Sequence, residues 1–233
     1  NRHLRSSEFD AFFFARGGYG AMRILDRIDY EAIAANPRPI VGFSDVTAFH
    51  LRMSSMGIAS IHGTMPIFFG QPEAWESVES IRRILFTGEC DVAWTPDQYN
   101  RAGSASGEMV GGNLSLVVDA LNTSAEPVTQ NRILVVEEVD EYFYKLDRMF
   151  TQLRRSGKLK DLAGLVERYF TAYPERRQAV VERPGTPRGV LGWSAVAAVA
   201  AALTNSKPGS NWPRKRWTSS QRKTSGCGTR TQS

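Results

Sequence analysis

The sequence is poor in cysteine, with only Cys90 and Cys227 among 233 residues. Two distant thiols are no disulfide framework, so the fold has to be held by an ordinary core, and they are compatible with a reducing compartment. Apolar residues make up 42% and charged residues 23%, which is ordinary globular usage. The length allows one large domain or two small ones.

Long hydrophobic runs are also lacking. The longest apolar stretch, residues 190–203, is shorter than the roughly 20 residues that a membrane-spanning helix needs. Residues 1–10 are polar and contain no apolar segment of the kind found in a secretory signal. We therefore expect a cytoplasmic protein. Because the chain starts with Asn1 rather than Met, we also expect its true beginning to be missing.

Acidic residues are absent from the end of the chain. Residues 183–233 hold 9 Lys and Arg with no Asp or Glu, whereas residues 1–182 have a net charge of −4. The tail is rich in Pro, Gly, Ser and Thr, which favours a disordered or non-native extension. A basic tail could instead bind nucleic acid or another acidic surface; we expect no nucleic-acid partner.

A strand, turn and helix pattern occurs twice near the start. Residues 9–15 and 40–43 are compact apolar runs, and each leads through a turn into a segment with helical spacing, at 21–28 and 46–56. Repetition of this unit predicts an α/β fold with parallel strands.

Mixed α/β patterning continues as far as about residue 165. We expect strands at 58–61 and 132–136, and helices at 73–86, 114–121 and 142–156. The polar, turn-rich region 97–107 is the best internal boundary. The chain is therefore divided into an N-terminal parallel-sheet domain at 1–98, part of a second mixed α/β domain at 99–182, and the tail at 183–233.

Ser44 lies where an apolar strand meets a helix, between Gly42 and Asp45. A sharp turn there would be a nucleophile elbow, which exposes the hydroxyl and places backbone N–H groups where an oxyanion forms. The full Gly-x-Ser-x-Gly pattern is not met, because residue 46 is Val. Taken alone, a plain helix N-cap at Ser44 and Asp45 is an equally good interpretation, since Ser and Asp are preferred there.

The loop Arg16–Gly20 has three glycines, so its backbone can approach a ligand closely. It does not complete a dinucleotide or phosphate-loop pattern. A tight turn without a ligand is the alternative.

Glu137 and Glu138 follow an apolar strand, and acidic residues continue to Asp147. A carboxylate at a strand end could orient a catalytic histidine. The alternative is a solvated loop that leads into a helix with favourable acids at its start.

The three histidines, His3, His50 and His62, all precede Glu137. His50 is six residues beyond Ser44 on one predicted helix, about 9 Å along its axis, and should not reach the hydroxyl. His62 follows a strand and could face a cleft or make a structural hydrogen bond. No zinc-ligand spacing occurs, so we expect no metal and no cofactor.

Taken together and in order, short segments over residues 9–166 resemble the LD-carboxypeptidase family. They are ARGGYG (15–20), VGFSDVT (41–47), IHGTM (61–65), VGGNLS (110–115) and LVVEE (134–138), followed by YKLDRM (144–149). The family includes cytosolic muramoyltetrapeptide carboxypeptidases and microcin-immunity peptidases.

The resemblance implies a metal-free serine peptidase with a Ser-Glu-His triad. Ser44 would be the nucleophile and Glu137 the triad acid, with Glu138 in place of the family's Asp. Backbone N–H groups of Gly18 and Asp45 would form the oxyanion hole.

Substrate-binding positions are expected at Arg16, Gly17, Tyr19 and His62. The implied reaction is release of a terminal D-alanine from a murein tetrapeptide during peptidoglycan recycling. The family also suggests a homodimer.

The sequence departs from the family where the base should be, since no histidine follows Glu137. The resemblance is lost by Glu182, and the family's first strand is missing. We therefore expect this chain to be inactive or nearly so. Alternatives are a non-catalytic muropeptide binder, a microcin-immunity-type peptidase and, last, a nucleic-acid-associated protein acting through its tail.

Overall fold

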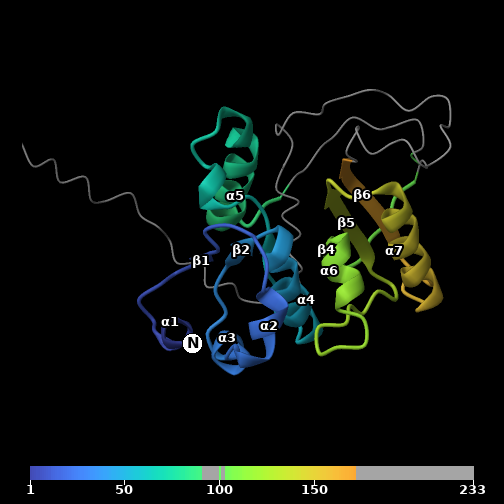
Figure 1. Ribbon diagram of the computed structural model, residues 1–233. Coiled ribbons are helices and arrows are strands. Elements are labelled where there is room, and N and C mark those ends of the chain that lie inside the picture. Colours follow the sequence, from blue (N-terminus) through green and yellow to red (C-terminus); the bar gives the residue numbers. More distant parts are fainter. Residues whose placement is uncertain (91–99, 101–102, 172–233) are drawn as a thin grey trace, which may run out of the picture.

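The protein, seen here as a computed structural model, contains two separate three-stranded parallel sheets (Figure 1). The structure describes residues 1–90, 100 and 103–171, with side chains through Glu167. The predictions about the tail at 183–233, and about the end of the second domain, lie outside these residues. None of the described helices is long and apolar enough to cross a membrane.

The first sheet has the order β1-β2-β3, formed by Phe12–Phe13, Ile40–Gly42 and Ile61–His62. All three strands are parallel, and Gly42 pairs in register with His62. Parallel strands direct their carboxyl ends to one edge of a sheet. The residues that follow β2 and β3 therefore emerge side by side, and Ser44 is among them.

Short helices connect and cover this sheet. In chain order they are α1 (Arg2–Arg5), α2 (Ala21–Ile24), the 3-10 turn η1 (Leu25–Arg27), α3 (Tyr30–Ala35), η2 (Ser44–Val46), α4 (Thr47–Ser55), η3 (Pro66–Phe68), η4 (Pro72–Ala74) and α5 (Trp75–Thr87). The N-cap of α3 is Asp29, whose carboxylate accepts a hydrogen bond from Ala32 N. The C-cap of α5 is Gly88, in the left-handed conformation.

The second sheet has the order β4-β5-β6, formed by Met109–Asn113, Ile133–Val139 and Gly164–Thr171. Its strands are also parallel. Helix α6 (Leu114–Asp119) follows β4 directly, with Asn113 as its N-cap, and α7 (Phe143–Arg155) connects β5 to β6. Both connections have the strand-helix-strand form that parallel sheets require.

One hydrophobic core contains residues from both sheets and their helices. Leu51 and Met53 of α4 are buried with Leu114 of α6, Val136 of β5 and Leu153 of α7. Burying each such side chain contributes roughly 1.5 to 3 kcal/mol. α4 lies between the two sheets (Figure 1), so the same helix that follows Ser44 also packs the second sheet against the first.

The predicted parallel α/β class is confirmed, and several boundaries differ. The helix expected at 21–28 is divided into α2 and η1, and the strand expected at 58–61 begins only at Ile61. β4 was not predicted as a strand, because Gly111 and Gly112 interrupt its apolar pattern. The expectation that Glu137 and Glu138 follow their strand is wrong: β5 continues to Val139.

The end of β4 lies tightly against the start of α4 and the end of β3. A Cβ atom on Gly112 would lie 2.6 Å from Thr47 Oγ1, 2.7 Å from Thr47 Cγ2 and 3.2 Å from His62 Nδ1. Gly112 also has a φ of +134°, which side-chain-bearing residues rarely adopt. Only glycine permits this approach.

We predict that Gly112→Ala lowers the free energy of unfolding by about 3 kcal/mol, since it combines overpacking with a strained backbone. Gly70→Ala is the matched control, because a Cβ there meets nothing within 4 Å and should change stability by less than about 0.5 kcal/mol. Urea unfolding followed by circular dichroism measures both. Equal stabilities of the two variants would contradict this packing argument.

Candidate active site

Ser44 occupies a sharp turn between β2 and α4. Its φ is +62°, in the left-handed region that is uncommon for residues other than glycine. Such a conformation costs on the order of 1 to 3 kcal/mol and persists only where the surroundings hold it. Ser44 is the first residue of η2, whose N-cap is Phe43, so the plain N-cap alternative is not what the structure shows.

Asp45 is not an N-cap of its own helix either. Its Oδ2 accepts a hydrogen bond of 2.9 Å from the backbone N–H of Ala21. Ala21 is the first residue of α2 and directly follows the glycine loop. The carboxylate therefore ties the turn at Ser44 to the end of the loop Arg16–Gly20.

That loop lies directly against Ser44. A Cβ on Gly17 would be 3.0 Å from Ser44 Cβ and 3.1 Å from its Oγ. The side chains of Arg16 and Tyr19 are exposed, and Tyr19 retains 85% of its accessible surface. Arg23 stacks on the Tyr19 ring and donates a hydrogen bond to its hydroxyl. The loop therefore presents an exposed aromatic and basic surface close to the serine.

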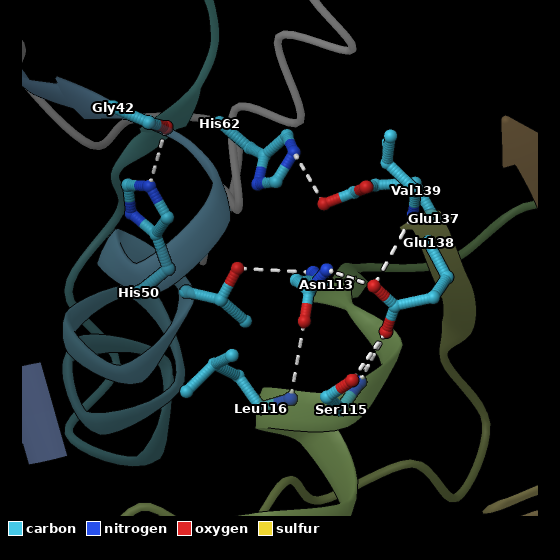
Figure 2. A network of polar contacts seen from close by, with 10 residues as sticks. Gly42, His50, His62, Asn113, Ser115, Leu116, Glu137, Glu138 and Val139 are labelled. Atoms are coloured by element: carbon cyan, nitrogen blue, oxygen red, sulfur yellow. Dashed lines mark hydrogen bonds and ion pairs between the residues drawn. The ribbon is translucent and has the colours of Figure 1, made fainter. Parts of the chain in front are cut away.

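Glu137 and His62 come from different sheets and face each other. Figure 2 shows the two side chains pointing toward one another, with His62 Nε2 4.0 Å from Glu137 Oε1. Each side chain is only 13–14% exposed. Glu137 Oε1 and His62 Nδ1 are buried atoms without a hydrogen-bond partner among the described residues. Nδ1 of His62 therefore makes no structural hydrogen bond to the described residues.

The pKa values show that this contact is not an ion pair at neutral pH. Burial, with a smaller effect of His50, lowers the pKa of His62 to about 3, so its imidazole is neutral. Burial, followed by the negative charge of Glu138, raises the pKa of Glu137 to about 7. Glu137 is therefore poised to gain or lose a proton near neutrality, as acid-base groups in active sites often are.

Glu138, the next residue along β5, has the opposite environment. Its carboxylate is buried and accepts hydrogen bonds from Asn113 Nδ2 at 3.0 Å, from the backbone N–H of Ser115 at 2.9 Å, from Ser115 Oγ, and from Val139 N (Figure 2). These donors offset the cost of burying a charge. Glu138 joins β5 to the start of α6.

Asn113 extends this network to the first sheet. Its backbone N–H donates to Thr47 Oγ1 at 3.0 Å, and its Oδ1 accepts from Leu116 N at 3.3 Å. Thr47 is three residues after Ser44. A continuous path of hydrogen bonds therefore leads from the helix that follows the serine to the carboxylate beside Glu137.

His50 does not contact Ser44, as expected. Its Nε2 lies 2.8 Å from Gly42 O and its Nδ1 lies 2.8 Å from Ser60 Oγ. The solvated-loop alternative for the two glutamates is wrong, because Glu138 is buried and Glu137 nearly so.

Sequence reasoning missed the contact between His62 and Glu137, and the network of Thr47, Asn113 and Ser115 with Glu138. One signal was available: two adjacent glutamates in one strand must point to opposite faces. In the described part of the chain, no cluster of three or more His, Cys, Asp and Glu side chains could hold a metal ion.

A serine on a positive-φ turn between a parallel strand and a helix is the arrangement of a nucleophile elbow in hydrolytic enzymes. Two family models match this chain: the LD-carboxypeptidase N-terminal domain over residues 1–63 and the LD-carboxypeptidase C-terminal domain over residues 106–191. The chain belongs to the LD-carboxypeptidase family.

Among curated relatives, the chain is similar to a probable murein peptide carboxypeptidase of Bacillus subtilis, with 34% identity over 75% of this chain and 57% of the relative. It is 29% identical to the murein tetrapeptide carboxypeptidase of Pseudomonas aeruginosa, over 74% of this chain and 59% of the relative. The microcin C7 self-immunity protein MccF of Escherichia coli is 24% identical, over 64% and 53%.

Solved structures agree on the fold. The muramoyltetrapeptide carboxypeptidase of Oxalobacter formigenes superposes with a TM-score of 0.68 at 26% identity, covering 74% of this chain and 60% of that one. MccF in complex with glutamyl sulfamoyl guanosine gives 0.64 at 20% identity, covering 76% and 63%, and shows the fold alone. The chain spans about half the length of the curated relatives it matches.

We predict that Glu137→Gln stabilises the protein increasingly as pH rises. The folded-state pKa of Glu137, about 7, lies above its ordinary value of 4.5. The stability associated with the protonated carboxyl is therefore fully present below pH 4.5 and is lost as pH rises through 7. Gln resembles the protonated form, so the variant should gain on the order of 3 kcal/mol over the unchanged chain at pH 8, and nothing at pH 4.

Chemical denaturation at several pH values measures this difference. Asp147→Asn is the control, because the Asp147 side chain is exposed on α7, and its curve should run parallel to that of the unchanged chain. The expectation is contradicted if the stability difference between Glu137→Gln and the unchanged chain stays constant from pH 4 to pH 8. Such a result would show that burial does not raise the pKa of Glu137.

Proposed function

We propose that this chain carries the site of a serine-type LD-carboxypeptidase with Ser44 as its nucleophile. The observation that supports this role most directly is the Ser44 turn itself: a positive φ at the end of β2, with Gly17 packed against the hydroxyl. Membership of the LD-carboxypeptidase family supplies the class of reaction. Glu137 is proposed as the triad acid.

In the proposed reaction, Ser44 Oγ attacks the carbonyl carbon of the peptide bond that precedes a terminal D-alanine. The hydroxyl proton passes to a base, and the negative oxygen of the intermediate is stabilised by the backbone N–H groups of Gly18 and Asp45. As the intermediate collapses, the base returns the proton to the peptide nitrogen, the C–N bond breaks, D-alanine leaves through its amine, and an acyl group remains on Ser44. Water then hydrolyses this ester and restores the serine.

The described residues offer no conventional base beside Ser44 and Glu137. The sequence has no histidine after Glu137, where the family resemblance places one. His62 lies beside Glu137, but its pKa of about 3 makes the imidazole a poor proton acceptor at neutral pH. We therefore propose that the chain binds its peptide and turns it over very slowly or not at all.

The proposed substrate is a murein tetrapeptide, consistent with a role in peptidoglycan recycling in the cytoplasm. The curated relatives from Bacillus subtilis and Pseudomonas aeruginosa are named for murein peptides. We propose that Arg16, Tyr19 and the backbone at Gly17 contact this peptide, with His62 at the inner end of the site. A homodimer is proposed from the family alone.

A microcin-immunity-type peptidase is the second candidate. It is favoured by Tyr19, an exposed aromatic ring beside the Ser44 turn that could stack on a nucleobase. Lower identity to the microcin self-immunity protein, 24% against 34% for the Bacillus subtilis relative, ranks it second.

We predict that the chain binds a murein tetrapeptide ending in D-alanine, and that Ser44→Ala changes the dissociation constant by less than about twofold. The hydroxyl is needed for the chemical step rather than for binding. Calorimetry gives the affinity, and chromatography of released D-alanine gives turnover, which should not exceed that of Ser44→Ala.

The corresponding tripeptide, which lacks the terminal D-alanine, is the ligand control and should bind more weakly. D-Alanine release that disappears in Ser44→Ala would refute the predicted inactivity while supporting the role of Ser44. Failure of the unchanged chain to bind any D-alanine-ended peptide would refute the proposed function. A comparison with a sulfamoyl nucleoside ligand distinguishes the second candidate.

A further inference from the structure

His50 is the most completely enclosed titratable side chain near the Ser44 turn. It lies on α4, is fully buried, and both ring nitrogens have partners: Gly42 O at 2.8 Å from Nε2 and Ser60 Oγ at 2.8 Å from Nδ1. A carbonyl oxygen can only accept a hydrogen bond. Nε2 therefore carries the proton, and Nδ1 accepts the proton of the Ser60 hydroxyl. These contacts specify one neutral tautomer (Figure 2 shows the contact with Gly42).

The carbonyl that His50 binds belongs to the last residue of β2, two residues before Ser44. Gly42 O also accepts a hydrogen bond from the backbone N–H of Gly63 at 3.0 Å. Two donors, one from α4 and one from the segment after β3, thus fix the same oxygen. The end of β2 is held from two directions.

One hydrogen bond within the Ser44 turn is long. Val46 N lies 3.3 Å from Phe43 O, at the long end of the hydrogen-bond range. A non-glycine residue with positive φ persists only when its surroundings over-determine the backbone. The surroundings must therefore supply the constraint, and the nearest fixed point before the turn is Gly42 O.

We infer that His50 is a positioning residue for Ser44: its imidazole, oriented by Ser60, fixes the Gly42 carbonyl and so holds the turn that presents the serine. The inference rests on the proposed role of Ser44 as the nucleophile. The ring nitrogens of His50 bind Gly42 O and the Ser60 hydroxyl rather than Ser44, so His50 acts on the serine through the backbone. It links α4, β2 and the residue that precedes β3 through one ring.

The electrostatic surroundings preserve this arrangement at neutral pH. Burial lowers the pKa of His50 to about 4, and the titratable group that faces it is His62, with ring centroids 5.8 Å apart. A proton on Nδ1 would turn the acceptor into a donor and require Ser60 to accept instead. Neutral His50 therefore both donates a hydrogen bond to Gly42 O and accepts one from the Ser60 hydroxyl.

Nitrogen-15 NMR of the full chain tests the tautomer directly, and amide hydrogen exchange tests the consequence. The His50 imidazole should show a protonated Nε2 and an unprotonated Nδ1 at pH 7. In His50→Phe, the amide of Gly63 and those of Val46 and Thr47 should exchange at least tenfold faster, beyond any uniform change across the protein. His50→Gln, whose amide can still donate to a carbonyl, should restore part of this protection.

Tyr30→Phe is the matched control. Tyr30 is buried in the same core, and its hydroxyl has no hydrogen-bond partner among the described residues, so its removal should leave exchange of the Gly63 amide within twofold. A merely structural role of His50 would speed exchange uniformly, whereas a positioning role speeds it selectively at the turn.

A proton on Nδ1, or wild-type exchange at Gly63 in a folded His50→Phe variant, would overturn the inference. If His50→Phe does not fold, Ser60→Ala replaces it: a second tautomer and faster Gly63 exchange are expected, and unchanged values of both refute the role. Binding of a D-alanine-ended peptide tests the proposed function separately. Its absence refutes that function, and the exchange ratios alone then decide whether His50 holds the turn.

Discussion

The arrangement of the site depends on one close approach, where the end of β4 lies against the start of α4. Gly112 has no side chain, so the Thr47 hydroxyl can reach the backbone N–H of Asn113 at 3.0 Å. Further hydrogen bonds join the two halves at the other end of α4, where Arg52 and Ser55 donate to Ser124 O and Ser124 donates to Asp26. Hydrogen bonds across the junction set its register, and that register places Glu137 beside His62.

Glu137 and Glu138 show how strongly local environment determines the chemistry of identical side chains. The alternation of a strand sends them to opposite faces of β5. Glu138 is surrounded by donors from Asn113 and Ser115, and therefore stabilises the fold as a buried charge. Glu137 has an unpartnered buried oxygen and a raised pKa. Its raised pKa lets Glu137 exchange a proton near neutral pH, as acid-base groups in active sites often do.

Family membership and the local geometry at Ser44 are independent observations, and both agree with the site of a hydrolytic enzyme. The family models match both halves of the described chain, and the strained turn at Ser44 is the feature that a nucleophile elbow needs. The neutral His62 beside Glu137 does not replace a conventional base, because burial holds its proton affinity too low. The described residues thus contain a proposed nucleophile, acid and glycine loop, arranged around a buried histidine pair.

The sequence by itself determined the parallel α/β class, the strand-turn-helix at Ser44 and the glycine loop at Arg16–Gly20. Each is a local pattern: apolar runs, turn residues and helical spacing are read over ten or so residues. The extent of β5, the existence of β4 and the contacts of Glu137, Glu138 and His62 were decided only by the tertiary structure. Burial and hydrogen-bond partners come from segments far apart in the chain, such as Thr47 and Asn113. No local pattern encodes which of two adjacent glutamates is held by several donors and which keeps a buried oxygen without a partner among the described residues.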